Sequence, residues 1–244
     1  MQANPVPILA SRKKIGIIAG SGPEAGIDLW TKLLAANRRM HGERFRGDLD
    51  APDVTILSES TLGLSMELAE NDEAVWQCLR RTAKAISQRV DYYAIACNTL
   101  NYYQPQLDAL GLPATLVSFA DAVTAFVRES RIERVALLGA RPVTDLGPWS
   151  HYRALAAHVG IELPKPAQAA QLHELIYDVK THGGNVDHIR RRFRGILDTL
   201  ESDTVLLACT ELPLIPAEVT GKQVVDVTDL VAQKLARLAN GQQP

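Results

Sequence analysis

The chain has 244 residues, of which 46% are hydrophobic and 22% are charged, values typical of a globular domain with a sizeable core. Its net charge of −2 argues against a nucleic-acid partner. Three cysteines are too few for a disulfide framework, and no apolar run approaches the roughly 18 residues of a membrane helix. The first 14 residues lack a long apolar region, so we predict a short tail rather than a signal peptide, and a cytoplasmic protein.

Strand and helix patterns alternate along the whole sequence. Strands are expected at 15–19, 54–57, 92–96, 114–117, 205–208 and 224–226, and residues 134–139 repeat the pattern of the first strand and its turn. Helices are expected at 24–37, 71–89, 121–130, 149–159, 168–180, 186–200 and 229–238. A polar stretch at 38–52 is expected to be a loop, and whether it closes over a site is left open.

This alternation predicts an α/β fold in which helices cover parallel sheets. The spacing indicates an internal duplication, because Cys97 follows Gly20 by 77 residues and Cys209 follows Gly139 by 70. We expect two similar α/β subdomains related by a pseudo-twofold axis, with a ligand site in the cleft at the strand ends. The first subdomain would comprise 1–116 plus 223–244 and the second 117–222.

Two cysteines occupy similar settings, each at the end of an apolar run and before polar residues that suit a helix start. A helix N-terminus lowers the pKa of a thiol, so a thiolate at one position and a thiol at the other would form an acid–base pair. A buried cysteine often only fills space, which is our interpretation of Cys78. The matched settings of Cys97 and Cys209 favour catalysis. No close Cys or His spacing indicates a metal site, and the scattered histidines are expected on the surface.

A glycine-rich turn, Gly20 to Gly26, follows the first strand and opens a helix. Pro23 suits the first helical turn, and the backbone around Gly22 would approach a small anionic ligand. A tight strand-to-helix connection without a ligand is the alternative. A dinucleotide loop is a weaker alternative, because Ala25 stands where the third glycine of that motif would be.

Three segments together resemble the aspartate/glutamate racemase family, in order and spacing over nearly the whole chain. They are the Gly-Ser-Gly-Pro-Glu-Ala turn, Cys97-Asn98-Thr99, and the stretch from Cys209 to Leu214. The resemblance implies a cofactor-independent isomerase with two α/β domains, an amino-acid or carboxylate substrate, and often a dimer. It also implies that Cys97 and Cys209 are the two bases, one for each enantiomer.

The resemblance further assigns substrate-binding residues. Asn98, Thr99 and Thr210 would bind the α-carboxylate and amino group, and Glu211 belongs to the same motif. Thr144 is similar to a family threonine in the turn of the second half. Lys180 lies where aspartate-selective members have a lysine near the substrate. Gly22 and Pro23 complete the set.

Two departures from the family pattern limit what the resemblance implies about the substrate. The family's Cys-Asn-Thr-Ala-His segment has Asn101 in place of its histidine. The segment that usually carries an arginine for the side-chain carboxylate is 58–65 here, and it contains no arginine. Loss of a bidentate carboxylate partner is a large change, so an acidic substrate is less well supported than the reaction type.

The sequence therefore predicts an amino-acid racemase of the aspartate/glutamate type that uses two cysteines and needs no cofactor. One alternative is a related two-cysteine isomerase of the maleate or hydantoin type. A second is a small-ligand-binding homologue without turnover, and a third is a dinucleotide enzyme. A membrane or nucleic-acid partner is not expected, whereas a homodimer is.

Overall fold

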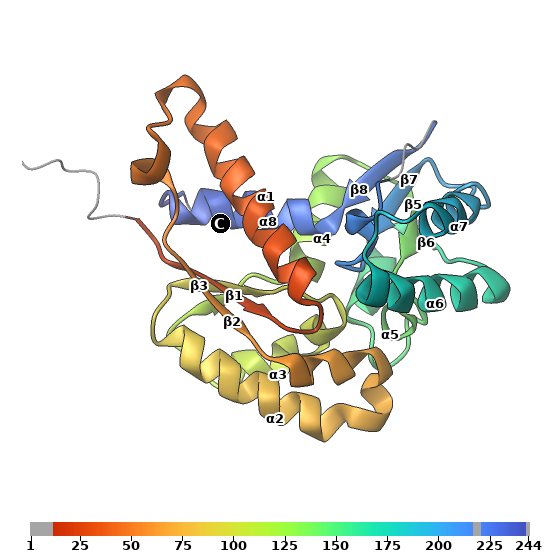
Figure 1. The fold of residues 1–244 in the computed structure, drawn as a ribbon, viewed down its shortest axis with the longest axis horizontal. Helices are drawn as coiled ribbons and strands as arrows, with labels where there is room; N and C mark the ends of the chain where they lie inside the picture. Colours follow the sequence, from red (N-terminus) through yellow and green to blue (C-terminus); the bar gives the residue numbers. More distant parts are fainter. Residues whose placement is uncertain (1–11, 217–220, 243–244) are drawn as a thin grey trace, which may run out of the picture.

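The computed structural model describes residues 12–216 and 221–242, which form eight parallel strands in two sheets (Figure 1). The first sheet has the order β2-β1-β3-β4 and contains β1 (Ile15–Ala19), β2 (Val54–Ser58), β3 (Tyr92–Ile95) and β4 (Thr115–Leu116). The second has the order β6-β5-β7-β8 and contains β5 (Arg134–Leu138), β6 (Gly160–Glu162), β7 (Thr204–Leu207) and β8 (Gln223–Asp226). Each half repeats the same strand order, so the predicted α/β fold with two similar halves is confirmed.

Helices connect the strands and bury their apolar faces against the sheets. They are α1 (Pro23–His41), α2 (Leu68–Ser87), α3 (Gln104–Asp108), α4 (Phe119–Glu129), α5 (Arg141–Thr144), α6 (Pro166–His182), α7 (Asp187–Leu197) and α8 (Val227–Ala239). One continuous core cluster joins both sheets to α1, α4 and α8, whereas two further clusters pack α6 and α7 on the second sheet and α2 on the first. The two halves are therefore fixed to each other through buried side chains. None of the helices within the described residues is long and apolar enough to span a bilayer.

The C-terminal segment contributes to both halves. β8 pairs in parallel with β7 and forms the edge of the second sheet, which corrects its assignment to the first subdomain. α8, in contrast, packs along α1 and α4. The ladder hydrogen bonds decide the place of β8, because an edge strand satisfies its backbone groups on the strand that it adjoins.

The stretch at 38–52 is not a loop over the cleft. α1 continues to His41, and two short 3₁₀ turns follow, Gly42–Arg44 and Gly47–Asp50. The buried Asp50 carboxylate accepts hydrogen bonds from the guanidinium groups of Arg12 and Arg46 and holds this segment in place. The Arg46 guanidinium lowers the pKa of Asp50. Because α1 has 19 residues at about 1.5 Å each, the segment lies about 28 Å from the start of the helix, too far to act as a lid.

Three elements in the second half differ from the predictions, and one of them is the short helix α5, which was not predicted. The helix expected at 149–159 is a 3₁₀ helix at His151–Ala157, which follows the helix-poor Gly147 and Pro148. β6 was not predicted, because three residues on an edge strand give too little alternation to detect. Residues 1–11 of the predicted N-terminal tail lie outside the described residues.

Candidate active site

The two cysteines lie at equivalent places in the two halves. Cys97 follows the end of β3 and Cys209 follows the end of β7, and each strand is third in the order of its sheet. Both thiols are buried, with 8% and 6% of the residue exposed. The two thiols thus lie at the carboxyl ends of corresponding strands, in agreement with the duplicated pattern of the sequence.

Hydroxyl groups surround Cys97. The Ser21 hydroxyl donates to Cys97 Sγ at 3.2 Å, and Ser21 Oγ lies 2.8 Å from Ser65 Oγ. Ser65 Oγ is also 3.7 Å from the sulfur. Sequence reasoning missed both serines. Ser21 lies in the glycine-rich turn already considered, but nothing in the sequence marks Ser65, which reaches the thiol only because the turn at Ser60–Glu67 follows β2.

A carboxylate lies beside Cys209. The Cys209 thiol donates to Glu211 Oε2 at 3.0 Å, and the Thr210 hydroxyl lies 3.3 Å from both that oxygen and the backbone oxygen of Ala96. Burial and the negative charge of Glu211 raise the pKa of Cys209, and the ammonium of Lys180 only partly opposes them. Cys209 is therefore protonated at neutral pH in this arrangement.

The predicted helix N-termini behind the thiols are much weaker than expected. Cys97 and Asn98 lead into a 3₁₀ helix of five residues, Thr99–Tyr103, and Cys209 leads into one of three residues, Leu212–Leu214. The second turn ends because Pro216 forces Ile215 into extended backbone. Helix dipoles of this length contribute little, so the expectation that they lower the thiol pKa values is wrong for Cys209.

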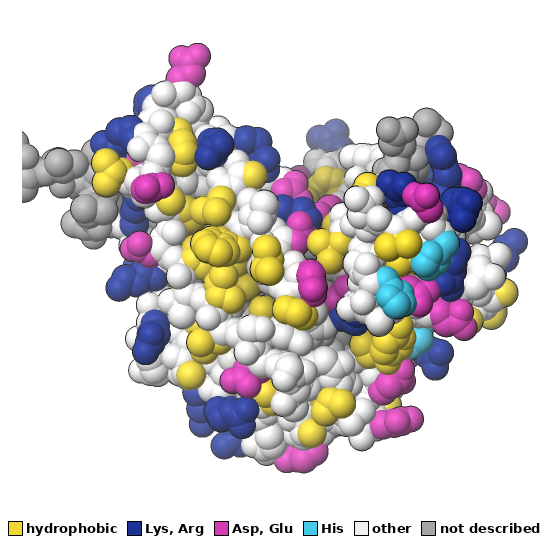
Figure 2. All heavy atoms as spheres, viewed as in Figure 1, with side chains coloured by type: hydrophobic (Ala, Val, Ile, Leu, Met, Phe, Trp, Pro, Cys, Tyr) yellow, Lys and Arg dark blue, Asp and Glu magenta, His cyan; other side chains and the backbone are white. Residues whose placement is uncertain are grey.

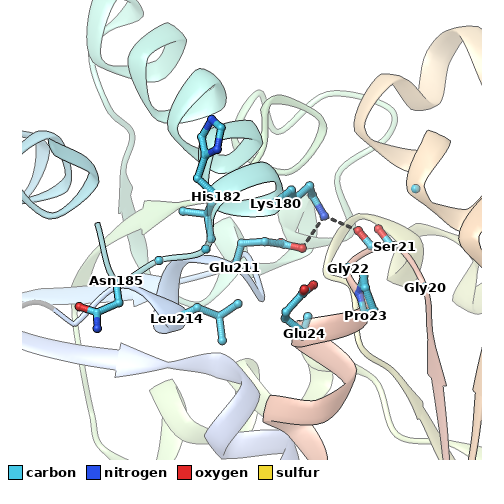
Figure 3. Close-up of a pocket in the computed structure, with 15 residues that line it drawn as sticks. Gly20, Ser21, Gly22, Pro23, Glu24, Lys180, His182, Asn185, Glu211 and Leu214 are labelled. Carbon is cyan, nitrogen blue, oxygen red and sulfur yellow. Dashed lines mark hydrogen bonds and ion pairs between the residues drawn. The ribbon is translucent and has the colours of Figure 1, made fainter. Parts of the chain in front are cut away.

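Lys180 joins the two halves across the site. Its ammonium extends from α6 and donates both to the backbone oxygen of Ser21 and to Glu211 Oε1 (Figure 3). Burial lowers the pKa of Lys180, but Glu211 and the thiols of Cys209 and Cys97 in their ionised form outweigh it and raise the pKa above its ordinary value. Since both thiols contribute, the one ammonium lies within electrostatic reach of Cys97 and Cys209.

A pocket of about 490 Å³ opens in front of this ion pair. Gly22, Pro23, Glu24, Gly184, Lys180 and Glu211 contribute to its lining, whereas the two thiols lie outside it (Figure 3). Glu211 lines the space and its Oε2 accepts from Cys209, so this carboxylate connects the pocket to the thiol. A Cβ at position 22 would lie 2.2 Å from Glu211 Oε1, so only glycine lets the turn approach the ion pair this closely.

A glycine is required at position 20 for a different reason. Its φ is +111°, and a Cβ there would lie 2.3 Å from the backbone oxygen of Glu59, directly after β2. Strand packing therefore requires Gly20 without any ligand, which favours the interpretation of this residue as a tight strand-to-helix connection.

Three further predicted residues, Asn98, Thr99 and Thr144, are buried and are not among the residues that line the pocket. Asn98 is buried, and its Oδ1 accepts a hydrogen bond from Tyr152 at 2.7 Å, whereas its Nδ2 has no partner among the described residues. Thr99 is buried next to it. The Thr144 hydroxyl donates at 3.3 Å to Ala140 within its own turn, and no described contact links it to either thiol.

Asn101, which replaces the family histidine, has a structural role. Its Nδ2 donates to the Cys97 carbonyl at 2.8 Å, and its Oδ1 accepts from the Phe119 N–H at 3.1 Å. The side chain ties the backbone of Cys97 to the start of α4. A buried amide that satisfies two backbone groups in this way holds the thiol in position without touching it.

Two histidines are not on the surface as predicted. His173 is buried and its Nε2 lies 3.3 Å from Glu67. Both ring nitrogens of His151 are buried without a partner among the described residues, and burial lowers the pKa of its imidazole to about 3. His151 is therefore neutral at physiological pH and packs against the ring of Tyr152 at a centroid distance of 4.1 Å.

This burial of His151 predicts a loss of stability in acid. The folded pKa of about 3 lies below the unfolded value of about 6.5, so the unfolded chain binds the extra proton between these limits. The free energy of unfolding should fall as the pH drops below 6.5, by up to about 1.4 kcal/mol per pH unit. Urea titrations at pH 7 and 5 should show a smaller difference for His151→Phe than for wild type. The exposed His158→Phe serves as control, and equal pH dependence in all three proteins would contradict the prediction.

The sequence matches the family model described as Asp/Glu/Hydantoin racemase over residues 18–235. The broad specificity amino-acid racemase RacX of Bacillus subtilis (strain 168) is 22% identical over 203 residues, which cover 81% of this chain and 85% of that protein. The match includes both cysteine segments and the turn at Gly20, since all of them lie within the matched residues of the family model.

Solved structures share the fold. The aspartate racemase of Picrophilus torridus superposes with a TM-score of 0.77 at 21% identity, covering 94% of this chain and 95% of that chain. An aspartate racemase homologue from Pyrococcus horikoshii OT3 gives 0.72 at 24% identity, covering 93% and 99%. With a family model that spans most of its length, the chain belongs to the Asp/Glu/Hydantoin racemase family and is an isomerase of that family.

Proposed function

We propose that the protein is a cofactor-independent racemase that inverts the α-carbon of an amino acid by two-base proton transfer between Cys97 and Cys209. The observation that carries this proposal is the placement of the two buried thiols at corresponding strand ends, within electrostatic reach of the same ammonium. A protein that only bound a ligand would have no need for two thiols in matched positions.

The ion pair of Lys180 and Glu211 matches the charges of an α-amino acid. Its ammonium would take the α-carboxylate of the substrate, and its carboxylate would take the α-ammonium group. Thr210 and Asn98 lie beside this pair and add a hydroxyl and an amide. A zwitterion that exchanges partners with an existing ion pair keeps every buried charge compensated.

In the reaction, one thiolate removes the α-proton and becomes a thiol. The electron pair of the broken C–H bond moves into the carboxylate, and the positive charge of Lys180 stabilises the resulting oxyanion character. The opposite thiol then donates its proton to the other face of the carbon, and the electron pair forms the new C–H bond. The raised pKa of Cys209 favours its protonated form, so in this structure Cys209 would act first as the acid that supplies the new proton. The roles are reversed for the other enantiomer.

We further propose that the substrate side chain is not restricted to acidic groups. The segment at 58–65, where family members usually carry a carboxylate-binding arginine, places the Ser65 hydroxyl near Cys97. The ammonium of Lys180 would be occupied by the α-carboxylate of the substrate, so it offers no further charge to a side-chain carboxylate. The broad specificity of the relative from Bacillus subtilis supports the same conclusion.

Solvent deuterium uptake tests this function. The protein, with no cofactor added, is incubated in D₂O with each enantiomer of alanine, serine, aspartate and glutamate, and with a hydantoin. Proton NMR follows the loss of the α-hydrogen, and polarimetry follows inversion. We expect exchange with inversion of at least one neutral amino acid from both enantiomers. Binding of these compounds in calorimetry without any exchange would contradict the proposal and favour a non-catalytic protein.

A homodimer stays a prediction, and the surface of α1 supports it. Ile27, Trp30 and Leu34 are 60%, 41% and 37% exposed. Their spacing places them along one face of the helix, where Figure 2 shows hydrophobic side chains gathered. An apolar stripe of this kind is unusual on a surface that faces only water.

A further inference from the structure

Tyr152 connects the second half of the protein to the site around Cys97. It is fully buried in the 3₁₀ helix His151–Ala157, and its hydroxyl donates to Asn98 Oδ1 at 2.7 Å. Asn98 directly follows Cys97 in the first half. A single buried hydrogen bond therefore crosses between the halves beside one of the two thiols.

The hydroxyl of Tyr152 also interacts electrostatically with the second thiol, Cys209, and it stays protonated. Burial raises the pKa of Tyr152, and the negative charge of a Cys209 thiolate raises it further. The hydroxyl thus lies within electrostatic reach of Cys209 while it contacts the neighbour of Cys97. It remains a hydrogen-bond donor throughout a cycle in which the thiols exchange charge.

This bond fixes the orientation of the Asn98 amide. An amide can rotate to present either its oxygen or its nitrogen, and the two orientations are nearly equal in shape. Because Tyr152 occupies Oδ1, the amide offers only the donor Nδ2, which is buried and has no partner within the described residues. A buried donor left in this state needs an acceptor from a ligand.

We propose that Tyr152 is a positioning residue for the racemisation proposed above. It holds Asn98 so that Nδ2 donates to the substrate carboxylate as negative charge moves onto it. A rotated amide would instead present Oδ1 to the same oxygen and repel it. The inference rests on the proposed function and adds a residue that acts only through Asn98.

The test is a double-mutant cycle on racemisation kinetics. Tyr152→Phe removes one oxygen and should lower kcat by about tenfold or more, while KM changes much less, because the lost interaction forms with the developing charge. Asn98→Ala should lower kcat by about 10²-fold. In the Asn98→Ala background, Tyr152→Phe should have no further effect, since the hydroxyl then has no amide to orient.

Tyr103→Phe is the matched control. Tyr103 is a similarly buried tyrosine whose hydroxyl donates to Asp72 of α2 at 2.6 Å, rather than to Asn98. Its substitution should lower the melting temperature without a change in kcat. Asn98→Asp is a further test variant, because it keeps an acceptor for Tyr152 but removes the Nδ2 donor. Its kcat should be at least as low as that of Asn98→Ala.

Several results would overturn the inference. Full activity of Tyr152→Phe, or of Asn98→Asp, would show that the oriented donor is not used. Additive losses in the double variant would show that Tyr152 acts independently of Asn98. If the wild-type protein exchanges no α-proton with any tested compound, both the proposed function and this inference are contradicted. If the wild type is active, the results above contradict only the role of Tyr152.

Discussion

Replacement of either Cys97 or Cys209 by serine is expected to abolish racemisation in both directions, with a loss of about 10³-fold in kcat. General acid–base catalysis contributes about 10²- to 10⁴-fold, and a serine hydroxyl is far less acidic than a thiol. Inversion requires one group on each face of the carbon, so the loss of either group stops the complete reaction. The measurement is polarimetry from each pure enantiomer.

The isotope pattern makes this prediction specific. In D₂O, each single variant keeps one thiol, which can still remove the proton on its own face and return a deuteron there. Cys97→Ser and Cys209→Ser should therefore exchange opposite enantiomers, without inversion. Cys78→Ser is the control, because Cys78 is a buried thiol inside α2 and does not follow the end of a strand. Inversion at the wild-type rate in either single variant would contradict the two-base mechanism.

Lys180→Gln and Glu211→Gln are expected to shift the pKa of Cys209 in opposite directions. The ammonium lowers the pKa of that thiol and the carboxylate raises it. Loss of the positive charge should therefore raise the pKa of Cys209, and loss of the negative charge should lower it. Both variants should lose about 10²-fold or more in kcat/KM, because each removes one partner of the substrate zwitterion.

Thiol alkylation measures these shifts without a need for turnover. The chain has three cysteines, so Cys209 is the one thiol left in a Cys78→Ser, Cys97→Ser background. Its iodoacetamide rate against pH should move to higher pH with Lys180→Gln and to lower pH with Glu211→Gln. Lys32→Gln is the control, since it removes a half-buried lysine that pairs with Asp28 and Asp226 on α1 and β8. Shifts in the same direction for both site variants would contradict this electrostatic account.

Local patterns in the sequence were sufficient for most of the fold. The buried strand at 15–19 and the amphipathic helix after it are encoded by residues close in the chain, so their prediction needed no tertiary information. β6 and β8 show where prediction from local patterns fails. The first is too short for a pattern, and the partner of the second is chosen by hydrogen bonds to β7.

The residues of the candidate site also fall into those that the sequence indicated and those that only the structure revealed. The glycine-rich turn and the residues after each strand are continuous motifs, and Cys97, Cys209 and Glu211 were named from them, whereas Lys180 was assigned only by the family resemblance. Ser65 and Tyr152 were not named, because each reaches the site from a turn whose path depends on packing. The helix dipoles expected behind the thiols also failed, in the second half for a local reason, because Pro216 ends the turn after Cys209.

The sequence alone determined the parallel α/β architecture, the duplication, and the two thiols at corresponding strand ends. These follow from hydrophobic periodicity and from spacing along the chain. Only the tertiary structure decided that Cys209 is protonated, that Lys180 pairs with Glu211 at the pocket, and that Tyr152 orients Asn98. Burial and charge at a site depend on groups up to 159 positions apart, such as Lys180 and Ser21, and that proximity arises only when the two halves pack together.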